Sequence, residues 1–126
     1  MNTNTRDTVE AHWQAANARD WQAFGKLIHP ELQYIVPQTR EYIESGAGYI
    51  EMFKTWPGNW IAQIRTLVAE EKNAICIIDF IVDGETMTGI SSFEVTAGLI
   101  RSVTDYWPEP YEPPPRQTEH MKRYAR

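Results

Sequence analysis

The chain of 126 residues lacks several features that mark large classes of protein. Its single cysteine, Cys76, excludes an internal disulfide and is typical of a reducing compartment. No apolar run is long enough to cross a membrane or has the form of a signal peptide. The net charge is −5 and no basic stripe is present, which disfavours nucleic acid as a partner. We therefore expect a cytoplasmic protein that binds neither membranes nor nucleic acid.

Short motifs for metals, phosphates and nucleophiles are also missing. The three histidines are scattered without metal-ligand spacing, and there is no glycine-rich phosphate loop or nucleophile elbow. We therefore expect no metal and no cofactor. The length and the hydrophobic content of 42% fit one globular domain with a real core. We predict a single domain over residues 1–126, with an extended tail from about residue 108 that begins PEPYEPPP.

The sequence is rich in aromatic residues, and five of them are tryptophans. Such large rings favour a wide cavity wall over a minimal aliphatic core. We therefore expect an aromatic-lined pocket inside the domain.

The first half of the chain has mainly the periodicity of helices. Residues 8–19 place Val9, His12, Trp13 and Ala16 on one face. Asp20 is expected to cap a second, short helix that stops near His29 and Pro30. A short strand is predicted over 31–36. Ser45 is then expected to cap a third helix, with Tyr49, Ile50, Phe53 and Trp56, that breaks at Pro57.

From residue 60 onward the period is that of strands, predicted over 60–70, 74–82, 86–95 and 99–107. A two-residue turn at Asp83-Gly84 would place Ile78 opposite Gly89, and a three-residue loop at 96–98 would place Gly89 opposite Asp105. Both turns put the same set on the core face: Cys76, Ile78, Phe80, Met87, Gly89, Ser91, Phe93, Val103, Asp105 and Trp107. This order predicts an α+β fold, with three helices followed by a strongly curved antiparallel sheet.

Asp105 is the one carboxylate on the predicted core face of these strands. It lies between Val103 and Trp107, and an aspartate buried there has its pKa raised, as a general acid or base near neutral pH requires. Gly89 is interpreted as leaving room beside it for a ligand. The competing interpretation is a structural acid that is hydrogen-bonded to a helix.

The helix face of His12 points at the sheet, which allows a proton-handling pair with Asp105. The competing interpretation is a core histidine bonded to a backbone carbonyl. The predicted catalytic residues are thus Asp105 and His12. The predicted ligand-binding wall consists of Trp13, Tyr34, Phe53, Phe80, Met87, Gly89, Ser91, Phe93, Val103 and Trp107.

Three segments together resemble a known superfamily over roughly residues 9–107. They are Asn17-Ala18-Arg19-Asp20 between the helices, Ser45-Gly46 at the start of a helix with Ile50 and Phe53, and Asp105-Tyr106-Trp107 at the end of the last strand. In order and spacing they resemble the nuclear transport factor 2-like superfamily, which includes ketosteroid isomerases and SnoaL-like polyketide cyclases. The resemblance implies a cystatin-like α+β barrel, with three helices packed into a bent sheet around a conical pocket.

The resemblance also bears on catalysis. SnoaL-like cyclases keep an aspartate at the end of the last strand, and Asp105 matches it. The steroid isomerase set is absent, because its base corresponds to Val36, its oxyanion tyrosine to His12 and its oxyanion aspartate to Ser91. Epoxide hydrolases of the superfamily need an Asp-Arg-Asp set, for which only Arg101 and Asp105 are found on one strand face.

Two function classes follow. The first is a cofactor-free enzyme that uses acid/base chemistry on a hydrophobic, carbonyl-bearing small molecule, as an isomerase, cyclase, dehydratase or hydrolase. The second is a non-catalytic ligand-binding or dimerisation domain of the same fold. We further expect a homodimer, because Ile75, Ile77, Ile81 and Ile90 make the outer face of the sheet apolar.

Overall fold

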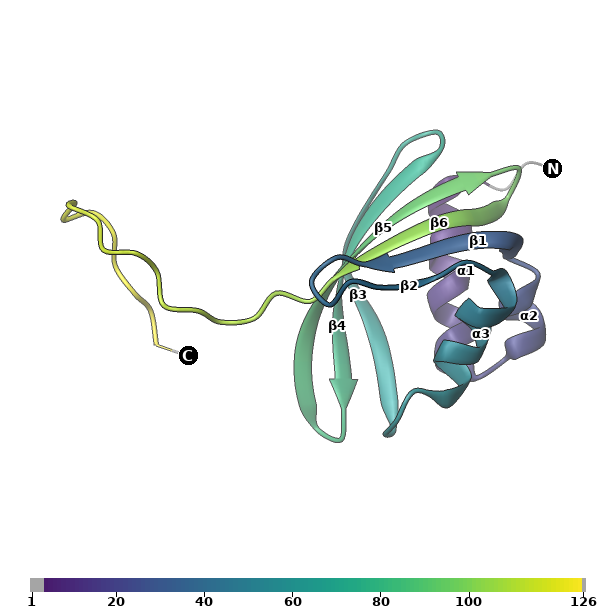
Figure 1. Ribbon diagram of the computed structural model, residues 1–126, viewed down its shortest axis with the longest axis horizontal. Coiled ribbons are helices and arrows are strands. Elements are labelled where there is room, and N and C mark those ends of the chain that lie inside the picture. Colours follow the sequence, from purple (N-terminus) through teal and green to yellow (C-terminus); the bar gives the residue numbers. More distant parts are fainter. Residues whose placement is uncertain (1–3, 126) are drawn as a thin grey trace.

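The computed structural model describes residues 4–125, which form three helices and six strands (Figure 1). In chain order the elements are α1 (Thr5–Ala18), α2 (Trp21–Gly25), β1 (Ile28–Val36), β2 (Glu41–Ile43), α3 (Gly46–Thr55), β3 (Trp60–Ala69), β4 (Asn73–Val82), β5 (Glu85–Thr96) and β6 (Leu99–Tyr106). Beyond β6 the described chain has no helix or strand. No helix among the described residues is long and apolar enough to span a membrane.

The helix starts agree with the predicted caps. The side chain of Asp20 accepts a hydrogen bond from the backbone N–H of Ala23, and that of Ser45 accepts one from Gly48. The first helix begins earlier than predicted, at Thr5, because Asn4 caps it through the N–H of Asp7.

Several element boundaries differ from prediction. The second helix ends at Gly25, and the chain enters β1 at Ile28, so His29 is a strand residue and does not end a helix. The backbone N–H of Ile100 donates to the carbonyl of Leu27, which draws this segment into the sheet. The strand β2 was not predicted because three residues carry too little periodicity. The third helix ends at Thr55, just before Trp56.

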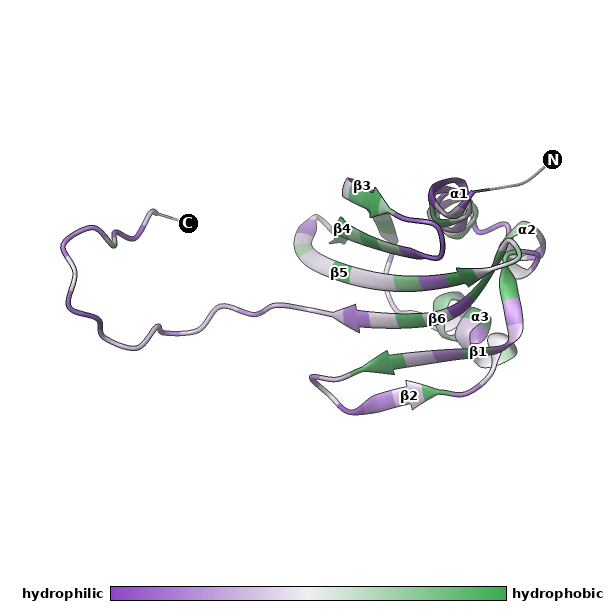
Figure 2. Ribbon diagram, turned by 90° about the horizontal axis from the view of Figure 1, so that it is seen from above, coloured by the Kyte–Doolittle hydropathy of each residue, from purple (hydrophilic) through white to green (hydrophobic). Residues whose placement is uncertain are grey.

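The sheet is curved and unclosed, with strand order β2-β1-β6-β5-β4-β3, and the helices lie together on one side of it (Figures 1 and 2). The predicted α+β class with three helices on a curved sheet is confirmed. Four of the strand pairs are antiparallel, as predicted, but β1 and β6 are parallel. This pairing brings together segments far apart in the sequence, so no local turn signalled it.

The predicted register is confirmed for the first hairpin and wrong for the second. Ile78 faces Gly89 as expected, but Asp105 faces Ser91, two residues from the predicted partner. The second hairpin has a two-residue turn at Ala97 and Gly98, both at positive φ, in place of the predicted three-residue loop. A bulge at Arg101 of β6 then lies opposite the step from Val95 to Glu94. A shift of two residues keeps every side chain on its face. Asp105 therefore still points into the core, where it is buried.

The outer face of the sheet is partly open to solvent. Its exposed apolar side chains include Ile61, Val68, Ile75 and Tyr106, of which Ile75 is 52% exposed. The other face packs against the helices and forms the core.

Candidate functional site

A cleft of about 590 Å³ opens between the β1–β2 hairpin, the end of α3 and the adjacent ends of β5 and β6. Its walls are mainly apolar and aromatic, with polar groups from the turn between β1 and β2. The lining residues are Tyr34, Val36, Thr39, Arg40, Glu41, Tyr42, Ile43, Met52, Trp56, Met87 and Trp107. A largely apolar cleft with a few polar groups suits a hydrophobic small molecule.

A second, much smaller cavity of about 20 Å³ adjoins the cleft, since Tyr34, Met52, Trp56 and Trp107 line both. Its remaining walls are Trp13, Phe53, Phe80 and Asp105. Its volume is enough for about one water molecule. The small cavity therefore extends the cleft toward the buried carboxyl group.

Asp105 accepts two hydrogen bonds inside the core. The hydroxyl of Tyr34 donates to Oδ2 at 2.7 Å, and the hydroxyl of Ser91 donates to Oδ1 at 2.7 Å. Burial raises the pKa of Asp105 above its ordinary value, and the two hydrogen bonds oppose that rise by favouring the charged form. The carboxyl group of Asp105 therefore binds a proton more tightly than a solvated aspartate does.

Tyr34 is the contact between this carboxyl group and the cleft. It lies on β1 next to Val103 of β6, and its side chain is buried on the core face. Burial raises the pKa of Tyr34 well above its ordinary value, and the charge of Asp105 adds to the rise. The phenol thus stays protonated at neutral pH. The sequence left the side of Tyr34 open because the predicted strand was too short to fix its alternation.

His12 does not pair with Asp105. Its Nε2 lies 2.8 Å from the hydroxyl of Tyr49, and aromatic rings of α1, α2, α3 and β5 surround it. Burial lowers the pKa of His12 to about 3, so the ring is neutral at physiological pH. It lines neither the cleft nor the small cavity. The ring of Tyr49 packs against that of Tyr34, with centroids 5.3 Å apart, so His12 is one aromatic layer away from the carboxyl site.

The structure separates the predicted wall residues into two groups. Those that line the cleft or the small cavity are Trp13, Tyr34, Phe53, Phe80, Met87 and Trp107. Those that line neither are Gly89, Ser91, Phe93 and Val103. Ser91 contributes to the site indirectly, through its hydrogen bond to Asp105.

Gly89 does not leave space for a ligand, contrary to the sequence-based interpretation. A Cβ on this residue would lie 2.9 Å from Cζ3 of Trp107 and 3.1 Å from Cγ1 of Ile78. The room that the glycine leaves is filled by the indole. Trp107 in turn lines both the cleft and the small cavity.

Sequence reasoning missed the polar side of the cleft. Thr39, Arg40 and Glu41 lie in and just after the turn between β1 and β2, and Glu41 pairs with Val36 across the two strands. The carboxylate of Glu41 accepts a hydrogen bond of 2.6 Å from the hydroxyl of Thr39. The sequence signal for this side of the cleft was a polar run between Pro37 and the third helix. Placing that run in the site required the strand β2, which was not predicted. Val36, Tyr42, Ile43, Met52 and Trp56 were likewise not predicted as wall residues.

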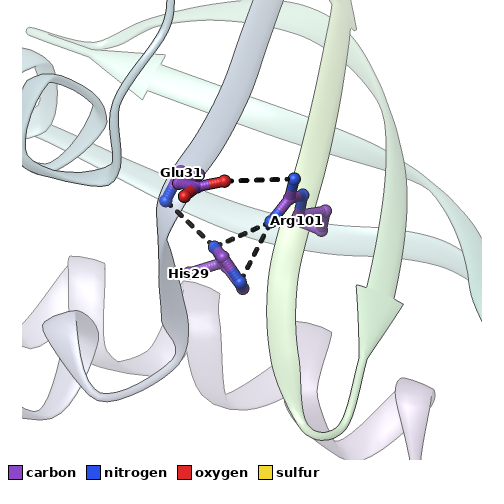
Figure 3. Close-up of polar contacts among 3 residues, drawn as sticks. All are labelled: His29, Glu31 and Arg101. Atoms are coloured by element: carbon purple, nitrogen blue, oxygen red, sulfur yellow. Dashed lines mark hydrogen bonds and ion pairs between the residues drawn. The ribbon is translucent and has the colours of Figure 1, made fainter.

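Arg101 does not approach Asp105. Its Nη1 lies 3.0 Å from Nε2 of His29, and its Nη2 lies 3.4 Å from Oε1 of Glu31 on β1 (Figure 3). The guanidinium is thereby held against β1, away from the carboxyl site. The arginine and aspartate of the epoxide hydrolase set therefore do not come together here.

The fold and this site can now be compared with known proteins. Residues 9–103 match the model of the SnoaL-like domain. No curated protein sequence matches the chain. Among solved structures, the "putative ketosteroid isomerase" of Kribbella flavida is 32% identical with a TM-score of 0.89, over 96% of this chain and 90% of that one.

Two more distant structures share the fold. An epoxide hydrolase of M. tuberculosis, described as LEH-like, is 18% identical with a TM-score of 0.68, over 80% of each chain. The "putative polyketide cyclase" of Sinorhizobium meliloti is 14% identical with a TM-score of 0.69, over 79% of this chain and 93% of that one. The match of the domain model over most of the chain, together with the Kribbella flavida structure, shows that this protein belongs to the SnoaL-like domain family.

Proposed function

We propose that the protein is a cofactor-free enzyme that uses acid/base chemistry on a hydrophobic, carbonyl-bearing small molecule bound in the cleft. The observation that carries this proposal is the hydrogen bond of 2.7 Å between Tyr34 and Asp105. It links a buried carboxyl group with a raised pKa to a phenol that borders the cleft. Perturbed acids of this kind gather at functional sites.

The acid half of the reaction follows from the protonation state of Asp105. When Asp105 is ionised, the hydroxyl of Tyr34 donates to it. When Asp105 is protonated, it can donate to the phenol oxygen, and the proton of Tyr34 is then free to point into the cleft. There it would donate to a substrate carbonyl oxygen and stabilise negative charge as it develops. Tyr34 is thus the group in contact with substrate, and Asp105 controls its proton.

The base half is assigned to Glu41. Its carboxylate lines the same cleft as Tyr34, and its negative charge contributes to the raised pKa of that phenol. A carboxylate on one side and a hydrogen-bond donor on the other can remove a proton beside a carbonyl while its oxygen is stabilised. In this assignment the base lies on β2 and pairs across the strands with Val36, the residue that by resemblance corresponds to the steroid isomerase base.

The named relatives support the class of chemistry but not one reaction. The three structures are described as a "putative ketosteroid isomerase", an LEH-like epoxide hydrolase and a "putative polyketide cyclase". These activities differ in substrate, and one fold hosts many chemistries. These relatives therefore support acid/base catalysis on a hydrophobic small molecule, without favouring one of the three reactions.

The experiment begins with a thermal-shift screen of aromatic polyketides, terpenoids and steroids, followed by turnover assays on the binders. We expect Tyr34→Phe and Asp105→Asn to keep the fold and to reduce kcat by about 10²–10³-fold, the range for one oxyanion donor. Glu41→Gln should lower kcat by about 10²–10⁴-fold, as for a general base. Asp79→Asn, on the outer face, is the matched control. Full activity of Tyr34→Phe on a turned-over ligand would contradict the proposal.

One observation favours the second class, a ligand-binding domain without catalysis. Both oxygens of Asp105 already have hydroxyl partners, so the carboxyl group is satisfied without any substrate. In that case ligands would bind and none would turn over. Asp105→Asn would then change stability alone and leave the affinity of every binder unaltered.

A further inference from the structure

Residues 108–125, called the arm below, leave the body at the end of β6 and run away from it on the side opposite the helices (Figures 1 and 2). Nearly every residue of the arm is exposed. Its hydrogen bonds join arm residues to one another: Arg123 donates to Glu112 at 2.8 Å, and the backbone N–H of His120 donates to Thr118 at 3.1 Å. Among residues 4–125, no hydrogen bond joins the arm to the body.

The root of the arm is nevertheless fixed. The side-chain amide of Gln38 donates to the backbone carbonyl of Trp107 at 2.9 Å and accepts from its backbone N–H. This pair holds the last residue before the arm to the β1–β2 turn. The proline-rich start of the arm is extended and semi-rigid. Such a stretch advances about 3.1 Å per residue, or about 25 Å over residues 108–115. The direction in which the arm departs is therefore set by the fold.

The side chains of the arm are those of a contact surface. Tyr111 is 81% exposed and Tyr124 is 94% exposed, and Met121 is also exposed. Tyrosine, methionine and arginine are enriched in protein interfaces, and the arm has all three. The two tyrosines, on a segment whose described residues make no hydrogen bond to the body, are therefore available for contact with another surface.

The similarity to the Kribbella flavida structure extends into the arm. Residues 108–126 are 19 of the 126 residues, so a match that covers 96% of the chain includes most of them. An extended segment without body contacts loses conformational entropy if it keeps one path, and contacts must compensate that loss. A path shared with a solved structure therefore indicates that the arm packs against another molecule.

The charge of the far part of the arm favours a second copy of this chain as that molecule. Residues 1–107 carry 14 acidic and 8 basic side chains, whereas residues 116–126 carry four basic side chains and one acidic. The far part of the arm is thus complementary to the acidic body. The arm also begins two residues beyond Tyr106, which lies exposed on the apolar outer face of the sheet. We propose that the arm of each copy binds the body of a second copy.

Cross-linking in the full chain tests this proposal. Benzoylphenylalanine is introduced at Tyr111 or at Tyr124, and ¹⁴N and ¹⁵N copies are mixed, unfolded together in urea, refolded and irradiated. We expect cross-links of mixed isotope content between arm peptides and body peptides. Cross-links confined to one isotope population would show that the arm folds onto its own body and would overturn the proposal. Absence of any link between arm and body would also overturn it.

The affinity of the copies gives a second readout. Tyr111→Ser combined with Tyr124→Ser should raise the dimer dissociation constant at least tenfold in sedimentation experiments, because exposed aromatic anchors contribute most to such contacts. Gln117→Ala is the control, as a truncation in the arm that removes no aromatic ring. A dissociation constant unchanged by the double substitution would refute a binding role for the arm. Neither readout depends on catalytic activity, so the proposed function and the proposed role of the arm can be refuted independently.

Discussion

The indole of Trp107 occupies the space beside Gly89. A Cβ on the glycine would lie 2.9 Å from Cζ3 of that ring, and Gly89 has no positive φ that would demand a glycine. The missing side chain is therefore explained by packing and not by backbone conformation. Because Trp107 lines both the cleft and the small cavity, a residue on the neighbouring strand sets the shape of the site without touching it.

A double-mutant cycle tests this relationship. Gly89→Ala should reduce the free energy of unfolding, because overpacking costs about 1–3 kcal/mol and exceeds the gain of about 0.4–1 kcal/mol from a less flexible unfolded chain. In a Trp107→Val background the same change should cost much less, and urea unfolding of the four proteins measures the difference. Equal costs in the two backgrounds would mean that Ile78, and not Trp107, limits the space.

Asp105 should make stability depend on pH. Burial raises its pKa above the ordinary value of 3.8, so the folded protein binds this proton more tightly than the unfolded chain does. The contribution of Asp105 to stability is therefore fully present below pH 3.8 and is lost as the pH rises through the folded pKa. Asp105→Asn does not titrate, so its stability relative to wild type should increase from pH 4 to pH 7 in urea unfolding.

Asp79→Asn is the control for Asp105→Asn, as an aspartate on the outer face that pairs with Arg65. If the stability difference between wild type and Asp105→Asn stayed constant from pH 4 to pH 7, the two hydroxyl donors would have offset the whole effect of burial.

The sheet shows which parts of the structure could be predicted from the sequence. The turn at Asp83-Gly84 fixed the first hairpin register, because a two-residue turn allows one pairing. The two-residue turn at Ala97-Gly98 and the bulge at Arg101 of β6 carry no comparable signal, and each shifts the pairing by one residue. The partner of Asp105 was therefore wrong by two residues although its face was right. The alternation of apolar and polar residues thus predicted which side chains enter the core, but not which residues pair across the strands.

The site was predicted only in part, for a related reason. Asp105 stood out because an acid among apolar core positions is unusual in a strand. Its partner Tyr34 belongs to β1, which joins β6 in parallel across most of the sequence, and no local pattern reports such a pairing. The polar rim at Arg40 and Glu41 depends on a strand of three residues. Contacts between distant segments were therefore the part that the sequence did not reveal.

The outer face of the sheet leads to a prediction about assembly. Ile61, Val68, Ile75 and Tyr106 are exposed there, and an apolar sheet face exposed in this way is typical of interaction sites. We propose that this face pairs with the same face of a second copy. Ile75→Lys should then give monomers at micromolar concentration in light scattering, while Gln14→Lys, which adds the same charge on the exposed side of α1, should not. A monomeric wild type would rule the pairing out.

His12 should also make stability depend on pH, with the opposite sign to Asp105. Burial lowers its pKa to about 3 from an ordinary value of 6.5, so the unfolded chain takes up a proton that the folded protein refuses. Stability from this residue is fully present above pH 6.5 and declines as the pH falls from 6.5 toward 3. At about 1.4 kcal/mol per pH unit, the contribution of His12 to the stability of wild type should fall by about 2 kcal/mol by pH 5.

His12→Gln isolates this effect, because a glutamine amide can still bond to Tyr49 and does not titrate. Asp105 titrates in the same range in both proteins, so urea unfolding at pH 7 and pH 5 should show this loss in wild type relative to His12→Gln. Tyr49→Phe is the matched control, since it removes the hydrogen bond of 2.8 Å but keeps the buried imidazole. It should be less stable at both pH values and still show the full dependence on pH. If stability changed with pH in the same way in wild type and His12→Gln, the folded protein would protonate the imidazole as readily as the unfolded chain does. His12 would then again be a candidate for proton transfer.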